Sequence, residues 1–472
     1  MSALEAKLWT RRLLLQRVAQ LSALGAACPL AINLAAIGEA AAFDATGYKA
    51  LVCIFLYGGN DYANTLVPYD ISNYDLYSAI RGGGPGRTRG GIALGRDELA
   101  ATALVPVGGQ TLTDGLQYAL APEMSGLKSL FDAGKLAVQL NVGPLIVPLT
   151  LAQYDSPNRV LYPLPPKLFS HNDQQSTWQS LGGEGSTVGW GGRLGDLAMS
   201  SNGNALLTCI SAAGNAVFVS GRNALQYQIS TEGAIKVSAL QSSPYGLTSV
   251  RDAMATLVTQ SSAQVLENEY AVVTRRSIQL EGGVNTALAG VTLNTTFDST
   301  NPLASQMMIV ARLIGARSAL GVNRQVFFVS LGGFDHHDFL MQNHPGLMAQ
   351  VNGAMSAFYQ ATVELGVASN VTTFTASDFG RTLTSNSDGS DHGWGSHHFV
   401  LGGAVKGGSF YGIAPHVSVS TDDQVGQGRL LPSTSVDQFA ATLALWFGVS
   451  ASELPGILPN IGNFASGNPG FL

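Results

Sequence analysis

Three apolar segments of this chain each end next to an acidic residue, and this repeated pattern restricts the fold most. The segments are residues 48–57, 325–331 and 371–375. The acids that follow them are Asp61, Asp335 and Asp378, the first two after paired glycines. A helical pattern over residues 345–365 connects the last two strands, as in a right-handed βαβ unit with parallel strands. Because ligands gather at the carboxyl edge of such sheets, the three carboxylates are expected to converge there.

The same pattern predicts an α/β fold with a mostly parallel central sheet between two layers of helices. The strand at residues 48–57 is almost entirely apolar, which is typical of a central strand that helices cover on both faces. Further strands are expected at residues 135–142 and 399–401, and long helices over 249–280 and 302–319. The chain therefore has the alternation of strands and helices that a layered α/β protein requires.

Length and punctuation indicate one large domain. The 472 residues are 46% hydrophobic and 12% charged, enough to bury a large core, and no repeat or linker divides residues 43–472. Insertions are expected at about 144–168, which prolines interrupt, and at 200–300. Within the second insertion, residues 282–302 are predicted to be a surface loop.

Histidines and carboxylates are concentrated near the last predicted strands. Six of the eight histidines lie between residues 336 and 398. Residues 378–398 alone hold His392, His397, His398 and three aspartates. Such a cluster is typical of a divalent metal site, and zinc, manganese or calcium would suit its ligands.

Three candidate residues each have a structural alternative. Ser170 precedes a predicted helix over 171–181, where it is either the helix N-cap or a nucleophile that a metal activates. Asp61 is either a metal ligand or a cap of the turn after its strand. Arg381 either steadies an anionic oxygen of a substrate or forms a salt bridge with Asp378 or Asp391.

Charge, cysteines and motifs exclude several classes of protein. The formal charge is −6 and the 25 Lys and Arg residues are scattered, so no nucleic-acid-binding surface is expected. Three cysteines form neither a disulfide framework nor a zinc-binding spacing. There is no G-x-S-x-G elbow, which argues against an esterase of the α/β-hydrolase class.

The N-terminal 42 residues resemble a twin-arginine export signal. Arg11 and Arg12 precede an apolar stretch over 18–37, and Ala40, Ala41 and Ala42 suit a cleavage site. The alternative is an ordinary amphipathic helix. The signal implies the twin-arginine translocase as a partner during export and a periplasmic or secreted protein. No later run reaches the roughly 18 apolar residues of a membrane span, so no stable span is expected.

Six short blocks resemble the signatures of the bacterial domain-of-unknown-function family 1501, DUF1501, whose members carry twin-arginine signals. The blocks are GGND, SHNDQQ, GGFDHH, SDFGRT, SDHGWGSHH and VLGGAVKGG. That family is similar in fold to the alkaline phosphatase and sulfatase superfamily, which implies a three-layer α/β/α domain with one or two metal ions at the sheet edge.

The resemblance also implies roles for individual residues. Asp61 resembles the metal aspartate of the first strand, and Ser170 resembles the nucleophile at a helix start. The remaining metal residues that it implies are Asp335 and His337 on one ion, Asp378 on the other, and the late histidine His392.

Two departures from the superfamily pattern concern the metal ligands. One residue separates Asp335 from His337, where three are usual, and Asp378-Phe379 replaces an adjacent Asp-His pair. A second ion would therefore lack its histidine or use His171 or His397. No C/S-x-P-x-R sequence is present, which argues against a typical sulfatase.

The sequence thus predicts an exported metal-dependent hydrolase-like protein acting on a phosphate or sulfate ester. Its substrate would be an anionic small molecule or polymer. The alternative is a non-catalytic periplasmic binding or assembly protein with a structural metal site.

Overall fold

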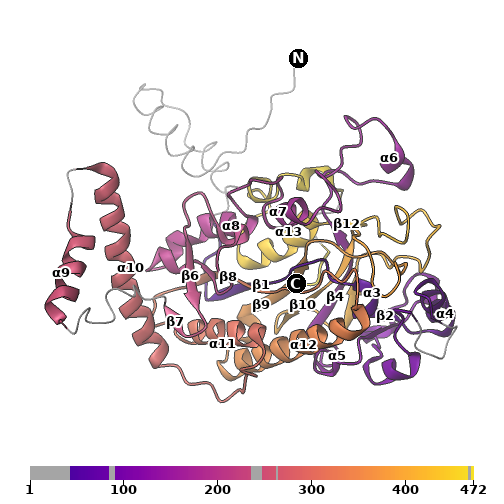
Figure 1. The fold of residues 1–472 in the computed structure, drawn as a ribbon, viewed down its shortest axis with the longest axis horizontal. Helices are drawn as coiled ribbons and strands as arrows, with labels where there is room; N and C mark the ends of the chain where they lie inside the picture. The colour runs from indigo at the N-terminus through magenta and orange to yellow at the C-terminus, as the bar shows by residue number, and fades with distance from the viewer. Residues whose placement is uncertain (1–42, 84–90, 235–246, 262–263, 466–468) are drawn as a thin grey trace, which may run out of the picture.

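The computed structural model describes residues 43–83, 91–234, 247–261, 264–465 and 469–472. The predicted export signal, residues 1–42, lies outside these described residues. Most strands belong to one mixed sheet that runs through the centre of the molecule, with helices on both of its faces (Figure 1). The predicted three-layer arrangement is confirmed.

The sheet is mostly parallel, as predicted. Its strands, in spatial order, are β11 (Ser409–Tyr411), β4 (Leu136–Gly143), β10 (Ser396–Gly402), β9 (Val371–Ser377), β1 (Lys49–Leu56), β8 (Arg324–Leu331), β5 (Cys209–Ser211), β6 (Gln226–Ser230) and β7 (Gly233–Ala234), and β12 (Thr434–Ser435) pairs with β4. Only β10 and β7 run against their neighbours among these described strands. The strands predicted from apolar runs are the long central strands.

Alternate side chains of β1 enter two separate cores. Ala50, Val52 and Ile54 belong to one apolar cluster, whereas Leu51 and Phe55 belong to the other. This alternation follows from the two-residue period of a strand. Each fully buried aliphatic or aromatic side chain contributes roughly 1.5–3 kcal/mol, so both faces of β1 fix the centre of the sheet.

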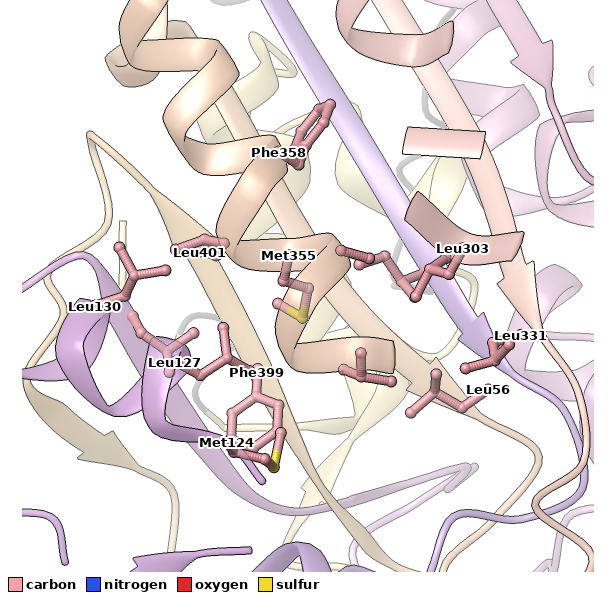
Figure 2. Packing of buried hydrophobic residues seen from close by; sticks show 14 of the residues in the cluster. Leu56, Met124, Leu127, Leu130, Leu303, Leu331, Met355, Phe358, Phe399 and Leu401 are labelled. Atoms are coloured by element: carbon pink, nitrogen blue, oxygen red, sulfur yellow. The ribbon is translucent and has the colours of Figure 1, made fainter. Parts of the chain in front are cut away.

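Helices cover both faces of the sheet. One layer holds α5 (Ser125–Asp132), α11 (Pro302–Gly315) and α12 (Leu340–Glu364), and the other holds α7 (His171–Ser180), α8 (Trp190–Ala198) and α13 (Val436–Phe447). In Figure 2, Leu303 of α11 and Met355 of α12 lie between their helices and the sheet. Helix α11 begins where predicted, because Asn301 accepts hydrogen bonds from the Leu303 and Ala304 amides and Pro302 occupies the first turn.

Smaller elements lie at the edges of the three layers. They are α3 (Tyr62–Thr65), β2 (Leu66–Pro68), α4 (Ile71–Ile80), β3 (Tyr118–Leu120), α6 (Leu151–Asp155) and α14 (Leu454–Ile457). Strands β2 and β3 form a separate antiparallel pair. Helix α6 is the α-helix of the segment 144–168, which was predicted to be an insertion. None of the described helices is long and apolar enough to cross a membrane.

The second predicted insertion contains a pair of helices in place of one long helix and a loop. Helices α9 (Thr248–Thr259) and α10 (Val265–Ala289) project from the side of the molecule that carries β6 and β7 (Figure 1). The predicted loop at 282–302 is wrong for its first residues, because α10 continues through Gly282 and Gly283. Glycine lowers helix stability by only about 1 kcal/mol per residue, so neighbouring good helix formers can carry the helix across it.

Candidate metal centre

Three neighbouring parallel strands bring their carboxyl ends to the same edge of the sheet. Leu56 of β1 pairs with Leu331 of β8 on one side and with Ser377 of β9 on the other. The segments that follow the three strands therefore start side by side, as the sequence predicted. This common edge is the starting point of the site.

Two glycines allow the segments to approach closely. Gly58 has φ +116°, and a Cβ atom there would lie 2.5 Å from the Asp335 backbone nitrogen. Gly59 has φ +78°, and its Cβ would lie 2.4 Å from the Phe379 ring. Side chains at either position would push the strand ends apart and would also strain the backbone.

Three imidazole rings converge on the carboxylate of Asp335. His171 Nε2 lies 3.4 Å from Oδ2 of Asp335, whereas His337 Nε2 and His392 Nε2 lie 3.2 and 3.3 Å from Oδ1. The two Nε2 atoms of His337 and His392 are 2.8 Å apart. His171 begins helix α7, whereas His337 follows β8 and His392 precedes β10. Segments far apart in the sequence thus supply the four ligand atoms of one cluster.

The opposite nitrogen of each ring is held by an oxygen atom. His171 Nδ1 lies 2.7 Å from Oδ2 of Asp378 and His392 Nδ1 lies 2.7 Å from the Phe169 carbonyl oxygen. His337 Nδ1 lies 3.3 Å from Oδ1 of Asp391. Since a backbone carbonyl oxygen only accepts, a neutral His392 carries its proton on Nδ1 and directs the lone pair of Nε2 towards Asp335. His171 and His337 have carboxylate oxygens near both ring nitrogens, with Asp335 on the Nε2 side. This arrangement is typical of metal-binding histidines.

Several polar atoms of the cluster lack suitable partners within the protein and could be satisfied by a cation. With protons on both Nδ1 atoms, the Nε2 lone pairs of His337 and His392 face each other at 2.8 Å and repel. His171 Nε2 is buried without a hydrogen-bond partner. His171, Asp335 and His392 have the mutual spacing of a metal-binding group. A cation between the three residues of this group would satisfy their ligand atoms at once, and His337 Nε2 lies beside them, 2.8 Å from His392 Nε2.

The surroundings keep Asp335 and His392 in binding-competent forms, whereas they favour the protonated form of His171, which a metal would have to displace. Burial raises the pKa of Asp335, but the hydrogen bond and charge of Arg381 outweigh it and hold that pKa below its ordinary value. Burial lowers the pKa of His392. In contrast, the hydrogen bond to Asp378 raises the pKa of His171. At neutral pH Asp335 is therefore ionised and His392 neutral, as metal ligands need to be.

Arg381 positions Asp335. Its side chain is fully buried, and Nη1 donates to Oδ1 of Asp335 at 2.9 Å and to the Gly58 carbonyl at 3.0 Å. Its Nε and Nη2 donate to Ser390. The salt bridge expected with Asp378 or Asp391 is thus made with Asp335 instead. With its donors engaged in this way, Arg381 fixes the carboxylate of Asp335.

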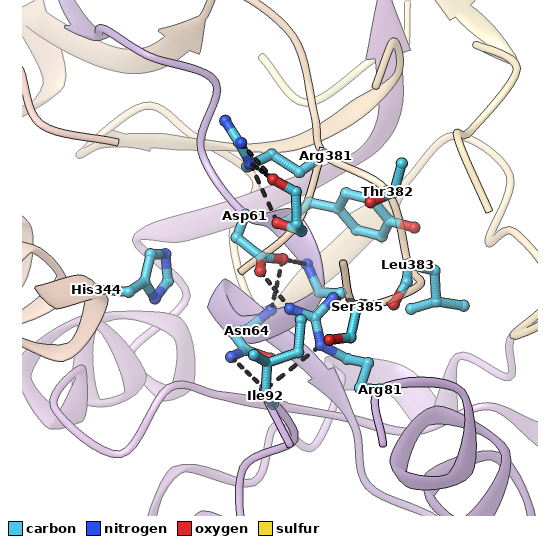
Figure 3. Close-up of polar contacts among 12 residues, drawn as sticks. Asp61, Asn64, Arg81, Ile92, His344, Arg381, Thr382, Leu383 and Ser385 are labelled. Carbon is cyan, nitrogen blue, oxygen red and sulfur yellow. Dashed lines mark hydrogen bonds and ion pairs between the residues drawn. The ribbon is translucent and has the colours of Figure 1, made fainter. Parts of the chain in front are cut away.

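Asp61 has partners other than the cluster, and Figure 3 shows it next to Arg81 and Asn64. Its Oδ2 forms a fully buried ion pair with Arg81, and its Oδ1 accepts from the Ala63 and Asn64 amides at the start of α3. Burial raises the pKa of Asp61, but Arg81 and His344 outweigh it and lower that pKa overall. These contacts correspond to the capping alternative, and they leave neither oxygen facing Asp335.

Asp378 stands behind His171. Its Oδ2 accepts from the Gln175 side chain at 2.8 Å and from the Gly58 amide at 3.2 Å, in addition to His171. Its Oδ1 is buried without a hydrogen-bond partner. This carboxylate therefore orients a ligand, and His171 occupies the position that the sequence assigned to Asp378.

Ser170 lies next to the cluster along the chain and has a different partner. It precedes the first residue of α7, but its side chain makes no capping hydrogen bond. The hydroxyl donates to Oδ2 of Asp173 at 2.9 Å. Among the described residues, no hydrogen bond joins Ser170 Oγ to the three histidines or to Asp335.

The other histidine that could have completed a site is elsewhere. His397 is buried between the rings of Tyr62 and Tyr118, and its Nδ1 accepts from the Asn141 amide. Burial lowers the pKa of His397 to about 3. His171 was one of two alternatives in the sequence, and its position at the start of a helix in the SHNDQQ block is the signal that favours it.

Comparisons with known proteins identify a family and a set of structures with similar chain paths. The model described as "Protein of unknown function (DUF1501)" matches residues 48–454. No curated protein matches the chain. The structure of Ps i-CgsB in complex with k-i-k-neocarrahexaose is similar over 88% of this chain and 77% of that chain, with 9% identity and a TM-score of 0.36.

Two further structures are similar at about the same level. A Bacteroides thetaiotaomicron protein of glycosaminoglycan metabolism covers 85% of this chain and 73% of its own, with 10% identity and a TM-score of 0.34. The PsFucS1 sulfatase from Pseudoalteromonas sp. covers 87% and 69%, with 10% identity and a TM-score of 0.32. The chemistry has therefore to be argued from the site itself.

Proposed function

This chain belongs to the DUF1501 family, and we propose that it is an exported metal-dependent hydrolase of phosphate or sulfate esters. The observation that carries the proposal is the convergence of three histidine Nε2 atoms on Asp335, each ring fixed from behind by an oxygen acceptor. Histidines that an oxygen atom orients from behind the ring are typical of metal ligands.

The donor set favours zinc or manganese. Three imidazole nitrogens and one carboxylate oxygen suit these ions, whereas calcium prefers oxygen ligands. The proposal is for one ion, held by His171, Asp335, His337 and His392. Among the described residues, one group has the spacing of a metal site, and it belongs to this cluster.

The exposure of the cluster favours catalysis over a structural role. The side chains of Asp335 and His337 are 45% and 43% exposed, so the ligands leave one side of the ion open. Structural zinc sites are closed by four protein ligands, whereas catalytic sites keep a position for water or substrate. When bound, the ion would polarise an ester oxygen and lower the pKa of a water or hydroxyl nucleophile.

Ser170 remains the proposed nucleophile, and a water molecule is its alternative. Ser170 directly precedes His171, and its proton already points to Oδ2 of Asp173. Asp173 is buried and lies 3.7 Å from Lys167 Nζ, so its carboxylate is the acceptor at hand when the hydroxyl attacks phosphorus or sulfur. Arg381 would hold Asp335, and Asp378 would hold His171, throughout the reaction.

Metal analysis and an ester panel test the proposal together. We expect about one zinc or manganese ion per chain and turnover of an aryl phosphate or an aryl sulfate by the processed protein. Asp335→Asn is expected to abolish both, whereas Asp422→Asn removes an exposed charge elsewhere and serves as the matched control. Bound metal without turnover of any ester would favour the non-catalytic binding or assembly protein, and a metal-free chain would refute both.

Export is a separate part of the proposal. We propose that residues 1–42 direct the chain through the twin-arginine translocase to the periplasm or beyond. Replacing Arg11 and Arg12 by lysine keeps the positive charge, so an unprocessed protein in the cytoplasm would indicate specific recognition of the paired arginines. Unchanged periplasmic levels of the double lysine variant would refute this route.

A further inference from the structure

Three cationic side chains surround the candidate metal centre, and two of them are neutralised. Arg381 is buried and forms an ion pair with Asp335. Lys167 lies within 3.7 Å of Asp173 and 3.3 Å of Glu184. Arg429 has no carboxylate within ion-pair distance among the residues that the structure describes. Its nearest anionic influence is Asp391, whose charge acts on Arg429 from beyond ion-pair distance, so the guanidinium is not held by a direct ion pair.

Arg429 is held at the edge of the cluster by backbone and ring contacts. Its Nε donates to the His392 carbonyl at 2.7 Å, and its Cζ lies 5.3 Å from the centre of the Phe169 ring. The Phe169 carbonyl in turn accepts from His392 Nδ1. Arg429 thus contacts both the metal-site histidine and the residue that orients it, which places the guanidinium beside the ligands.

The outer edge of the guanidinium is available. Nη1 has one long hydrogen bond, 3.5 Å to the Gly426 carbonyl, and Nη2 has no hydrogen-bond partner in the described part of the chain. The side chain is partly buried, so water satisfies it only in part. A cation that is partly removed from water and unpaired costs free energy that an anion would recover.

We propose that Arg429 binds an anionic oxygen of the substrate beside the metal ion, an inference that rests on the proposed function. Stacking on Phe169 fixes the plane of the guanidinium, and a planar fork matches two oxygens of a phosphoryl or sulfuryl group. Arg429 is thus the residue that selects tetrahedral oxyanions, the role that the sequence suggested for Arg381.

Anion binding by the metal-loaded protein tests this role without turnover. Inorganic phosphate and sulfate are titrated calorimetrically into wild type, Arg429→Gln, Arg429→Lys and Arg159→Gln. Arg159 is exposed and donates to the Tyr154 carbonyl, so its replacement removes the same charge without removing a hydrogen bond to the cluster. We expect Arg429→Gln to weaken anion binding about tenfold or more, Arg429→Lys to weaken it less, and Arg159→Gln to leave it unchanged, with full metal content in all four.

Each other outcome overturns the inference. Equal anion affinity in wild type and Arg429→Gln would show that Arg429 makes no contact with the anion. Loss of metal in Arg429→Gln would show that Arg429 acts by holding His392. The titration is repeated on the chelated protein. If the purified wild type holds no metal, the proposed function is refuted. The anion affinities of chelated wild type and Arg429→Gln still decide whether Arg429 binds the anion.

Discussion

Two aspartates of this molecule follow the same Gly-Gly-x-Asp pattern on adjacent strands, and the structure uses them differently. Asp61 follows β1 and Asp335 follows β8, and each pairs with an arginine. The side chain of Asp61 is 0% exposed, whereas that of Asp335 is 45% exposed and also faces three histidines. Helix α3 begins directly after Asp61 and takes its oxygens, whereas two histidines follow Asp335 before any helix begins.

The difference shows that a strand-end motif fixes where an acid lies but not which way it faces. The residues after the motif decide this, because an immediate helix start presents amides that a carboxylate caps. Asp61 therefore stabilises the edge of the sheet, and Asp335 is left to bind a ligand. The distinction is tested most directly by measuring both the unfolding free energy and the metal affinity of variants at the two positions.

The largest expected effect on stability is that of Asp61→Asn. Asparagine has the same shape but leaves the guanidinium of Arg81 buried and unpaired, so we expect about 3–5 kcal/mol of lost unfolding free energy. Urea denaturation of the chelated protein measures this loss. Metal content of the folded variant should equal that of wild type; a parallel loss of metal would return Asp61 to the ligand set.

Asp335→Asn and His392→Ala should have the opposite profile. Each removes a ligand atom, so we expect metal affinity to fall at least about 100-fold, more than for an outer-shell residue. The unfolding free energy of chelated His392→Ala should change less than that of Asp61→Asn, because no buried cation loses its counter-ion. Asp335→Asn also removes the counter-ion of the buried Arg381, so its loss of stability should lie between the two, since Asp335 itself is 45% exposed. Competition with a chromophoric chelator measures the affinity. Full metal retention in both variants would mean that the cluster is only a hydrogen-bond network.

Asp378→Asn should have an intermediate effect and separates an orienting residue from a ligand. Asparagine keeps an oxygen near His171 Nδ1 but loses the charge, so we expect metal affinity to fall about 10- to 100-fold. The same chelator competition measures it. An effect as large as that of Asp335→Asn would indicate direct coordination by Asp378, as the sequence had implied.

The sequence was sufficient for the fold because apolar runs and helical periodicity are local signals. The central strands and the helices over 302–315 and 340–364 can each be predicted from the pattern of one continuous segment. Ligand geometry is not local. Whether Asp378 coordinates a metal or supports His171 depends on how α7 packs next to β9. The two residues are more than two hundred positions apart in the sequence, and no local pattern indicates their contact. The partner of Asp61, Arg81, likewise lies at the C-terminal end of helix α4, a position that no motif marks.

Replacement of Ser170 should have the smallest effect on stability and the most informative effect on activity. A capping serine contributes about 1 kcal/mol, but Ser170 makes no capping bond, so Ser170→Ala should cost only a few tenths of that scale in thermal unfolding. Ser170→Asp offers a capping oxygen without a transferable hydroxyl and places a second carboxylate near Asp173, so its stability should be no higher than that of Ser170→Ala.

Ser170→Ala loses all ester turnover if Ser170 is the nucleophile, because alanine cannot form the covalent intermediate, and Ser170→Asp loses it unless its carboxylate attacks in place of the hydroxyl. Metal content should stay at the wild-type level in Ser170→Ala, because the hydroxyl that is removed donates to Asp173 and to no residue of the cluster. Turnover that persists in Ser170→Ala would transfer the attack to a water molecule. In that case the hydrogen bond to Asp173 would be a local contact of α7. Ser170 would then resemble Asp61, because its motif brings it close to the site but a neighbouring residue occupies its side chain.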